Sequence, residues 1–180
     1  CDLLLEENTR PRMLSLPEQA LLLFLRGVNL NPGAEPEDMV SLRIFADARR
    51  VISLRLRPVR ATEALIADLA AGNGPKSASE VILSLGHYLT DKIENLVTEL
   101  SEQVDEQEEM VDAEQRLVPD HGQLLQMRRR AASLRRFLAP QRDIYAQLTR
   151  HQLPWFLADD TDYWNELNNR LIRYLEELEL

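Results

Sequence analysis

A run of carboxylates is the feature of this sequence best suited to chemistry. Eight acidic residues occur between positions 99 and 114 with no Lys or Arg before the last of them: Glu99, Glu102, Asp105, Glu106, Glu108, Glu109, Asp112 and Glu114. Spacings of three and four place Glu102, Glu106 and Glu109 in one helical row, and Asp105, Glu108 and Asp112 in another. Because carboxylate oxygens suit hydrated divalent cations, we interpret the run as a cation-attracting surface. The alternative is a solvated helix face balanced by basic residues elsewhere in the chain.

Three histidines could add imidazole ligands, although all are far apart in sequence. His87 lies four residues before Asp91 on a predicted helix, and His121 follows Asp120 in a predicted turn. His151 could meet Asp159, Asp160 or Asp162 across the loop at Pro154. Zinc favours such imidazole and carboxylate ligands. The candidate metal ligands are His87, Asp91, Asp120, His121, His151, Asp159 and Asp160. An ordinary surface role is the alternative for each of them.

No catalytic motif accompanies these candidates. The sequence has no GxSxG, P-loop, GxGxxG or HExxH pattern. A zinc hydrolase would need three ligands around an open position, and no such set is visible. Cys1 is the single cysteine, so no disulfide can form within the chain. We therefore expect no enzyme.

Charge is segregated along the chain. Residues 79–118 hold two basic and eleven acidic residues, net −9, whereas residues 119–152 hold seven basic and two acidic residues, net +5. This predicts that the acidic and basic helices lie against each other or against neighbouring subunits. The basic cluster comprises Arg128, Arg129, Arg130, Arg135 and Arg136. It could bind phosphate or anionic lipid, but pairing across the hairpin is the favoured interpretation, and a net charge of −9 argues against nucleic acid.

Hydrophobic periodicity predicts a small α/β unit followed by long helices. Residues 20–30 are typical of a buried strand, and residues 39–46 and 50–57 alternate as half-buried strands do. The alternation in the last strand places Ile52, Leu54 and Leu56 on one face. A short helix over 61–71 should end at the Gly-rich stop that follows it.

Everything after residue 77 reads as helical. One helix should end near residue 117 before Pro119, and a second should cover 124–150 with a heptad seam and a bend or break at Pro140. A third begins near Thr161, and its apolar stripe is still strong at the last residue. We therefore interpret the chain as a fragment whose last helix continues. Its longest apolar run has six residues, too few to cross a bilayer.

The stretch LRRFLAPQRDIYAQLTRHQLPW, residues 134–155, closely resembles the CorA-type metal-ion transporter family, and most closely its zinc-transporting members. The segments MVSLRIFADARRVISLRLR and LAAGNGP extend the resemblance over essentially the whole chain. The resemblance implies a homopentamer with a cytoplasmic funnel at the bacterial inner membrane. Each subunit would have an α/β/α sandwich, two packed helices, and a stalk helix leading to membrane helices that this chain does not contain.

On this basis the expected class is α+β: a truncated α/β/α sandwich over 1–76, a long antiparallel helical hairpin over 77–152, and the start of a stalk helix over 153–180. The stalk stripe is expected to line the funnel and to contact other subunits; it comprises Trp164, Leu167, Leu171, Tyr174 and Leu178. The expected function is a regulatory and vestibule domain that attracts divalent cations, zinc above all, and couples to the pore. The alternative is a soluble scaffold or adaptor that binds partner helices through its heptad seams.

Overall fold

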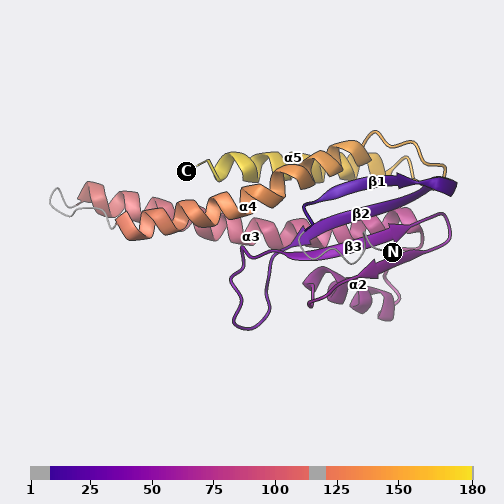
Figure 1. Ribbon diagram of the computed structural model, residues 1–180, viewed down its shortest axis with the longest axis horizontal. Helices are drawn as coiled ribbons and strands as arrows, with labels where there is room; N and C mark the ends of the chain where they lie inside the picture. The colour runs from indigo at the N-terminus through magenta and orange to yellow at the C-terminus, as the bar shows by residue number, and fades with distance from the viewer. Residues whose placement is uncertain (1–8, 114–120, 180) are drawn as a thin grey trace.

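The computed structural model describes residues 9–113 and 121–179. Within these residues, four strands precede four helices, and Figure 1 shows the strands beside the long helices. The strands are β1 (Arg12–Leu16), β2 (Ala20–Gly27), β3 (Val40–Ala46) and β4 (Val51–Leu54), with a 3-10 turn at Pro17–Gln19 between the first two. The helices are α2 (Arg60–Ala70), α3 (Ala78–Ala113), α4 (His121–Leu148) and α5 (Asp160–Glu177). The predicted α+β class is confirmed.

The strands form an antiparallel meander in the order β1-β2-β3-β4. All eight residues of β2 are buried, as its unbroken apolar run predicts for an inner strand. In β3, buried and half-buried residues alternate. Leu23 of β2 lies opposite Ile44 of β3, and both belong to the buried cluster on the helix side of the sheet.

The edge strand β4 is more exposed than the half-buried strand predicted from its alternation. Its alternation is real, but Ile52, Leu54 and Leu56 are 46%, 43% and 86% exposed. Ile52 lies opposite Phe45, so it faces away from the helices that cover Ile44. Leu56 lies beyond the end of β4. The apolar face of this strand is therefore its outer face, because only the register to β3 decides which face meets the core.

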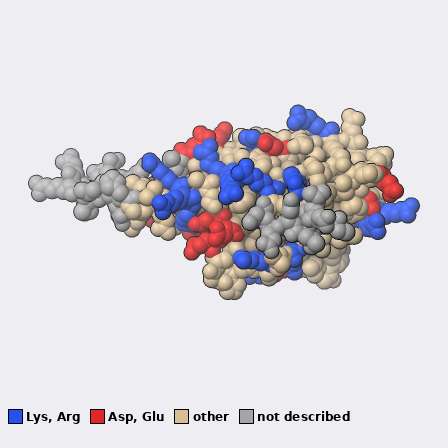
Figure 2. All heavy atoms as spheres, in the orientation of Figure 1, with Lys and Arg blue, Asp and Glu red and all other residues tan. Residues whose placement is uncertain are grey.

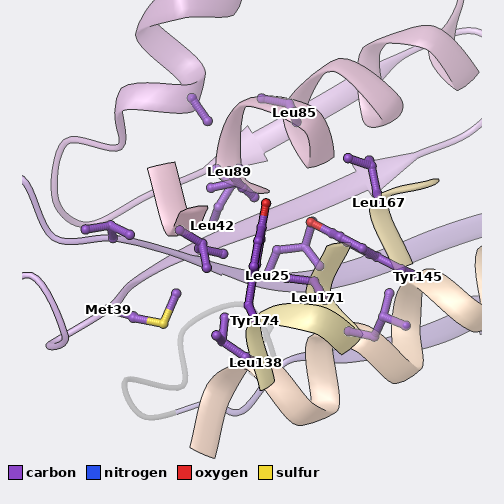
Figure 3. Packing of buried hydrophobic residues seen from close by; sticks show 14 of the residues in the cluster. Leu25, Met39, Leu42, Leu85, Leu89, Leu138, Tyr145, Leu167, Leu171 and Tyr174 are labelled. Atoms are coloured by element: carbon purple, nitrogen blue, oxygen red, sulfur yellow. The ribbon is translucent and has the colours of Figure 1, made fainter. Parts of the chain in front are cut away.

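Helices α3, α4 and α5 extend along the long axis of the molecule, and the α3–α4 hairpin projects beyond the sheet (Figure 1). Their inner faces meet the sheet in one hydrophobic cluster, in which Leu25 and Leu42 lie near Leu89 of α3, Tyr145 of α4 and Leu171 of α5 (Figure 3). Helix α4 runs through Pro140 without interruption, so of the predicted bend or break the break is excluded.

The stripe along α5 is buried inside the chain. Trp164 and Leu171 are 0% exposed, and Leu167, Tyr174 and Leu178 are 2% exposed. Helix α5 packs on both α3 and α4, and at Gly86 a Cβ atom would lie 2.8 Å from the Trp164 ring. The prediction that these five side chains line a funnel or contact other subunits is therefore wrong, because they fill the core of their own chain. Any contact by α5 must use its opposite face.

Candidate functional site

The carboxylates of the acidic run that the structure describes lie on the solvent side of α3. Glu99, Glu102, Asp105, Glu106 and Glu109 are exposed, while the side chains of Glu108 and Asp112 lie outside the described set. Asp105 and Asp112 follow Glu94 by eleven and eighteen residues, close to three and five helical turns, so both positions lie on the same side of α3 as Glu94.

The basic helix does not neutralise this run. Arg130 of α4 reaches α3, but it donates to the Gln103 amide oxygen at 3.1 Å and forms its ion pair with Glu37 at 3.0 Å. Arg135 pairs with Glu179 of the C-terminal segment at 3.1 Å. Among the side chains described, no ion pair joins the acidic run to α4. The two helices lie against each other as predicted, but the predicted ion pairs between them are not found among the side chains that the structure describes.

His87 and Asp91 come together as their spacing predicts. His87 Nε2 lies 3.4 Å from Asp91 Oδ2, and both side chains are about half exposed, at 53% and 41%. Beside His87 is a cavity of about 290 Å³, lined by apolar and aromatic groups together with Glu166. Over residues 9–113 and 121–179, no three His, Cys, Asp or Glu side chains converge as a metal site. This pair thus offers at most two ligands.

Asp91 is also shared with a cation that sequence reasoning missed. Arg170 of α5 donates through Nη2 to Asp91 and to Glu94, each at 2.7 Å, and through Nε to the Tyr174 hydroxyl at 3.0 Å. Burial lowers the pKa of Arg170, but the hydrogen bonds to Asp91, Tyr174 and Glu94 outweigh burial and raise it. A metal ion at His87 would therefore compete with a guanidinium for Asp91.

The third histidine does not meet its predicted partners. The His151 ring packs edge-on against Phe156, with centroids 6.3 Å apart. Asp160 is 5% exposed and accepts a hydrogen bond from Ser79, whose hydroxyl also accepts the Leu157 backbone N–H. The predicted role of Asp160 as a ligand is wrong, because its carboxylate ties the start of α5 to the start of α3.

The remaining predicted ligands are Asp159, Asp120 and His121, and the structure brings none of their described side chains to a metal site. Asp159 is exposed at the start of α5. Asp120 lies outside the described residues, as does the side chain of His121, whose backbone begins α4.

A buried polar network between α3, α4 and the sheet also escaped the sequence analysis. Gln141 of α4 is 0% exposed; its Oε1 accepts the Arg26 backbone N–H at 2.7 Å, and its Nε2 donates to the Arg26 carbonyl at 3.2 Å. The Tyr145 hydroxyl lies 3.3 Å from both Thr90 Oγ1 and the Gly86 carbonyl. Burial raises the pKa of Tyr145 to about 12, although hydrogen bonds with Thr90 and Gln141 oppose the shift. This network orders the core and presents no reactive group to solvent.

Known proteins resemble this chain over essentially its whole length. The family described as "CorA-like Mg2+ transporter protein" matches residues 2–180. The divalent cation transporter CmaX of Pseudomonas aeruginosa is 67% identical over 180 residues, which is all of this chain and 54% of that protein. The zinc transport protein ZntB of Pectobacterium atrosepticum is 34% identical over 173 residues, covering 96% of this chain and 52% of that protein.

Solved structures agree. The structure of the full-length CmaX protein superposes with a TM-score of 0.95 at 66% identity, covering 99% of this chain and 55% of that one. The ZntB cytoplasmic domain from Vibrio parahaemolyticus RIMD 2210633 superposes at 0.86 with 27% identity, covering 99% of this chain and 70% of that one. The chain spans about half the length of the curated relatives it matches. In the part of the chain that the structure describes, no helix has the length and apolar character to cross a membrane.

Proposed function

We propose, since this chain belongs to the CorA-like Mg2+ transporter protein family, that it is the cytoplasmic domain of a homo-oligomeric divalent-cation transporter with zinc as the principal ion. The observation that carries the proposal is the likeness of 99% of the chain to a ZntB cytoplasmic domain. The names of CmaX and ZntB support a divalent cation, and ZntB supports zinc. The inner membrane would be reached through parts of the polypeptide outside this chain.

The exposed carboxylates of α3 would concentrate cations at the entrance of the pore. Asp105, with Glu108 and Asp112, occupies the side of α3 that carries Glu94, the partner of Arg170 on α5. Because no three ligands converge among the described residues, the carboxylates would attract cations that keep their water shells. They would not replace the water molecules and coordinate the ion directly. His87 and Asp91 would form a weak secondary zinc contact. Helix α5 would transmit movement to the pore in a pentameric ring, as expected for a stalk.

The adaptor alternative loses its basis. It required heptad seams on α4 and α5 that are free to bind partner helices, but Leu134, Leu138, Leu167 and Leu171 are all buried in the chain's own core. An enzymatic role gains no support, since the family is one of transporters.

Zinc uptake by the full-length protein in liposomes tests the proposal. In Asp105→Asn/Glu108→Gln/Asp112→Asn, the initial uptake rate should fall by up to about tenfold at low ionic strength, because the local cation concentration drops. The difference should vanish near about 0.5 M salt, where charges are screened within a few ångströms. Carboxylates on two other helices, α2 and α4, provide the control, Glu63→Gln/Asp143→Asn, which should match wild type. Full-length protein that carries no zinc would refute the choice of ion, and equal rates at low salt would refute the role of the α3 carboxylates.

A further inference from the structure

The cavity of about 290 Å³ beside His87, here named the α3–α5 cavity, has no part in the proposed function. It is partly open to solvent, and both helices contribute to its lining. The lining residues are Leu83, Ser84, His87 and Tyr88 of α3 with Tyr163, Glu166 and Leu167 of α5. Apolar and aromatic walls with a few polar groups are the usual form of a small-molecule site. The lining therefore indicates which kind of ligand this cavity suits.

Aromatic rings form much of the wall of the α3–α5 cavity. The His87 and Tyr88 rings have centroids 6.2 Å apart and planes that meet at 61°, so together they enclose a corner. The Tyr88 hydroxyl donates to Asp68 of α2, which holds this ring in place. Tyr163 adds a third ring from α5 and is 58% exposed. Because a cation within about 6 Å of a tyrosine ring centroid is attracted to the ring face, this lining suits a positive charge.

The charges around the α3–α5 cavity also favour a cation. Glu166 is the one carboxylate among the lining residues, and none of them is Lys or Arg. In the part of the chain that the structure describes, no ion pair reaches Glu166. Arg170 lies one turn farther along α5, but its guanidinium bonds to Asp91 and Glu94. Lys and Arg side chains gather instead where α4 crosses the view in Figure 2, so an anion would find its counter-charges on that face and not in this cavity.

We infer that the α3–α5 cavity binds a small organic ammonium ion that carries methyl or short alkyl groups on its nitrogen. The rings of Tyr88 and Tyr163 attract the charge, and Glu166 balances it. Leu83 and Leu167 contact the alkyl groups. Alkyl substitution matters because apolar walls favour methyl groups over the water shell of a bare ammonium ion.

This inference goes beyond the proposed function and does not depend on it. A metal ion is a poor match for the cavity, since its lining offers only one imidazole and one carboxylate, and no three such ligands converge over residues 9–113 and 121–179. A failure of zinc transport would leave the inference intact, and a failure of ammonium binding would leave the zinc experiment interpretable.

A titration of the 180-residue chain with choline chloride, followed by backbone amide NMR, tests the inference. Choline should shift the signals of residues 83–88 and 163–167 in a saturable way, with a dissociation constant of roughly 1–10 mM, and equal sodium chloride should not. The neutral compound 3,3-dimethyl-1-butanol has the shape of choline, with carbon in place of the charged nitrogen. It should bind at least about fivefold more weakly, because it lacks the charge that the rings attract.

Variants of exposed residues separate the contributions of the ring and the carboxylate. Tyr163→Leu should weaken choline binding at least about threefold, whereas Tyr163→Phe, which keeps the ring, should stay within about twofold of wild type. Glu166→Gln should also weaken binding at least about threefold. The matched control is Glu177→Gln, because Glu177 is exposed on the same helix but does not line the cavity, and it should bind like wild type.

Three results would overturn the inference. The first is no saturable shift with choline up to about 50 mM, well above the expected dissociation constant. The second is equal affinity for choline and its neutral analogue, which would make the cavity merely apolar. The third is wild-type affinity in Tyr163→Leu or in Glu166→Gln, which would place choline elsewhere on the molecule.

Discussion

Replacing Gln141 by Met should be among the most damaging single changes in this protein that leave side-chain size nearly unchanged. Met has the length and volume of Gln but cannot hydrogen-bond to the Arg26 backbone. Arg26 lies beyond Phe24, whose pairing with Arg12 is the last of the β1–β2 ladder, so β1 does not supply partners to the Arg26 backbone on this side. The side chain is 0% exposed, so water cannot readily replace it. An unsatisfied buried donor or acceptor costs about 1–3 kcal/mol, so losing both partners should cost about 2–5 kcal/mol.

That loss is a large part of the roughly 5–15 kcal/mol that stabilises a typical domain. Urea unfolding followed by circular dichroism should show a lower midpoint with an unchanged slope. Gln147→Met is the matched control, because Gln147 lies on the same helix and is exposed; its free energy of unfolding should stay within about 0.5 kcal/mol of wild type. If the two variants prove equally stable, the Gln141 amide does not complete the hydrogen bonding of β2, and the reasoning fails.

Two further predictions concern the same part of the core. Gly86→Ala should lower the free energy of unfolding by about 1–3 kcal/mol, although Ala favours helices more than Gly does, because the new methyl group would press on the Trp164 ring. Thermal melts measure the effect. Gly122→Ala is the control, because Gly122 is exposed on α4, and it should not lower the stability of the protein. Tyr145 has a pKa near 12 when folded, above its usual value near 10 when unfolded, so the unfolded state loses its proton first and stability falls as pH rises through this window. Urea titrations should show that Tyr145 contributes a loss of up to about 2–3 kcal/mol between about pH 10 and 12. In Tyr145→Phe the total loss should be smaller by this amount, and the remainder comes from Tyr88 and Tyr174, whose pKa values are also raised. A loss unchanged in that variant would assign the effect to other groups.

Local patterns predicted the elements well. The apolar run over 20–30 became β2, the alternation over 39–46 became β3, and the three long helices begin within a few residues of their expected positions. The i, i+4 spacing of His87 and Asp91 likewise predicted a contact that the structure contains. These predictions succeeded for one reason. The periodicity of a strand or helix depends on residues that are close in sequence, and so do contacts within one helix.

Contacts between distant segments were predicted poorly. Arginines 128–136 were assigned to the acidic helix, yet Arg130 pairs with Glu37 in the β2–β3 loop. The contacts of Arg170 with Asp91 and Glu94 were not predicted, and neither was the contact of Gln141 with Arg26. These partners lie 76–115 residues apart along the chain.

The sequence by itself determined which residues share a face, and therefore the α+β class, the acidic rows of α3 and the apolar stripe of α5. Only the tertiary structure decided what each face rests against. It turned Ile52 outward and the Trp164 stripe inward, and it paired Arg130 of α4 with Glu37 of the β2–β3 loop rather than with the acidic run of α3. The physical reason is that periodicity records the shape of one element, whereas burial and pairing depend on the elements that pack around it.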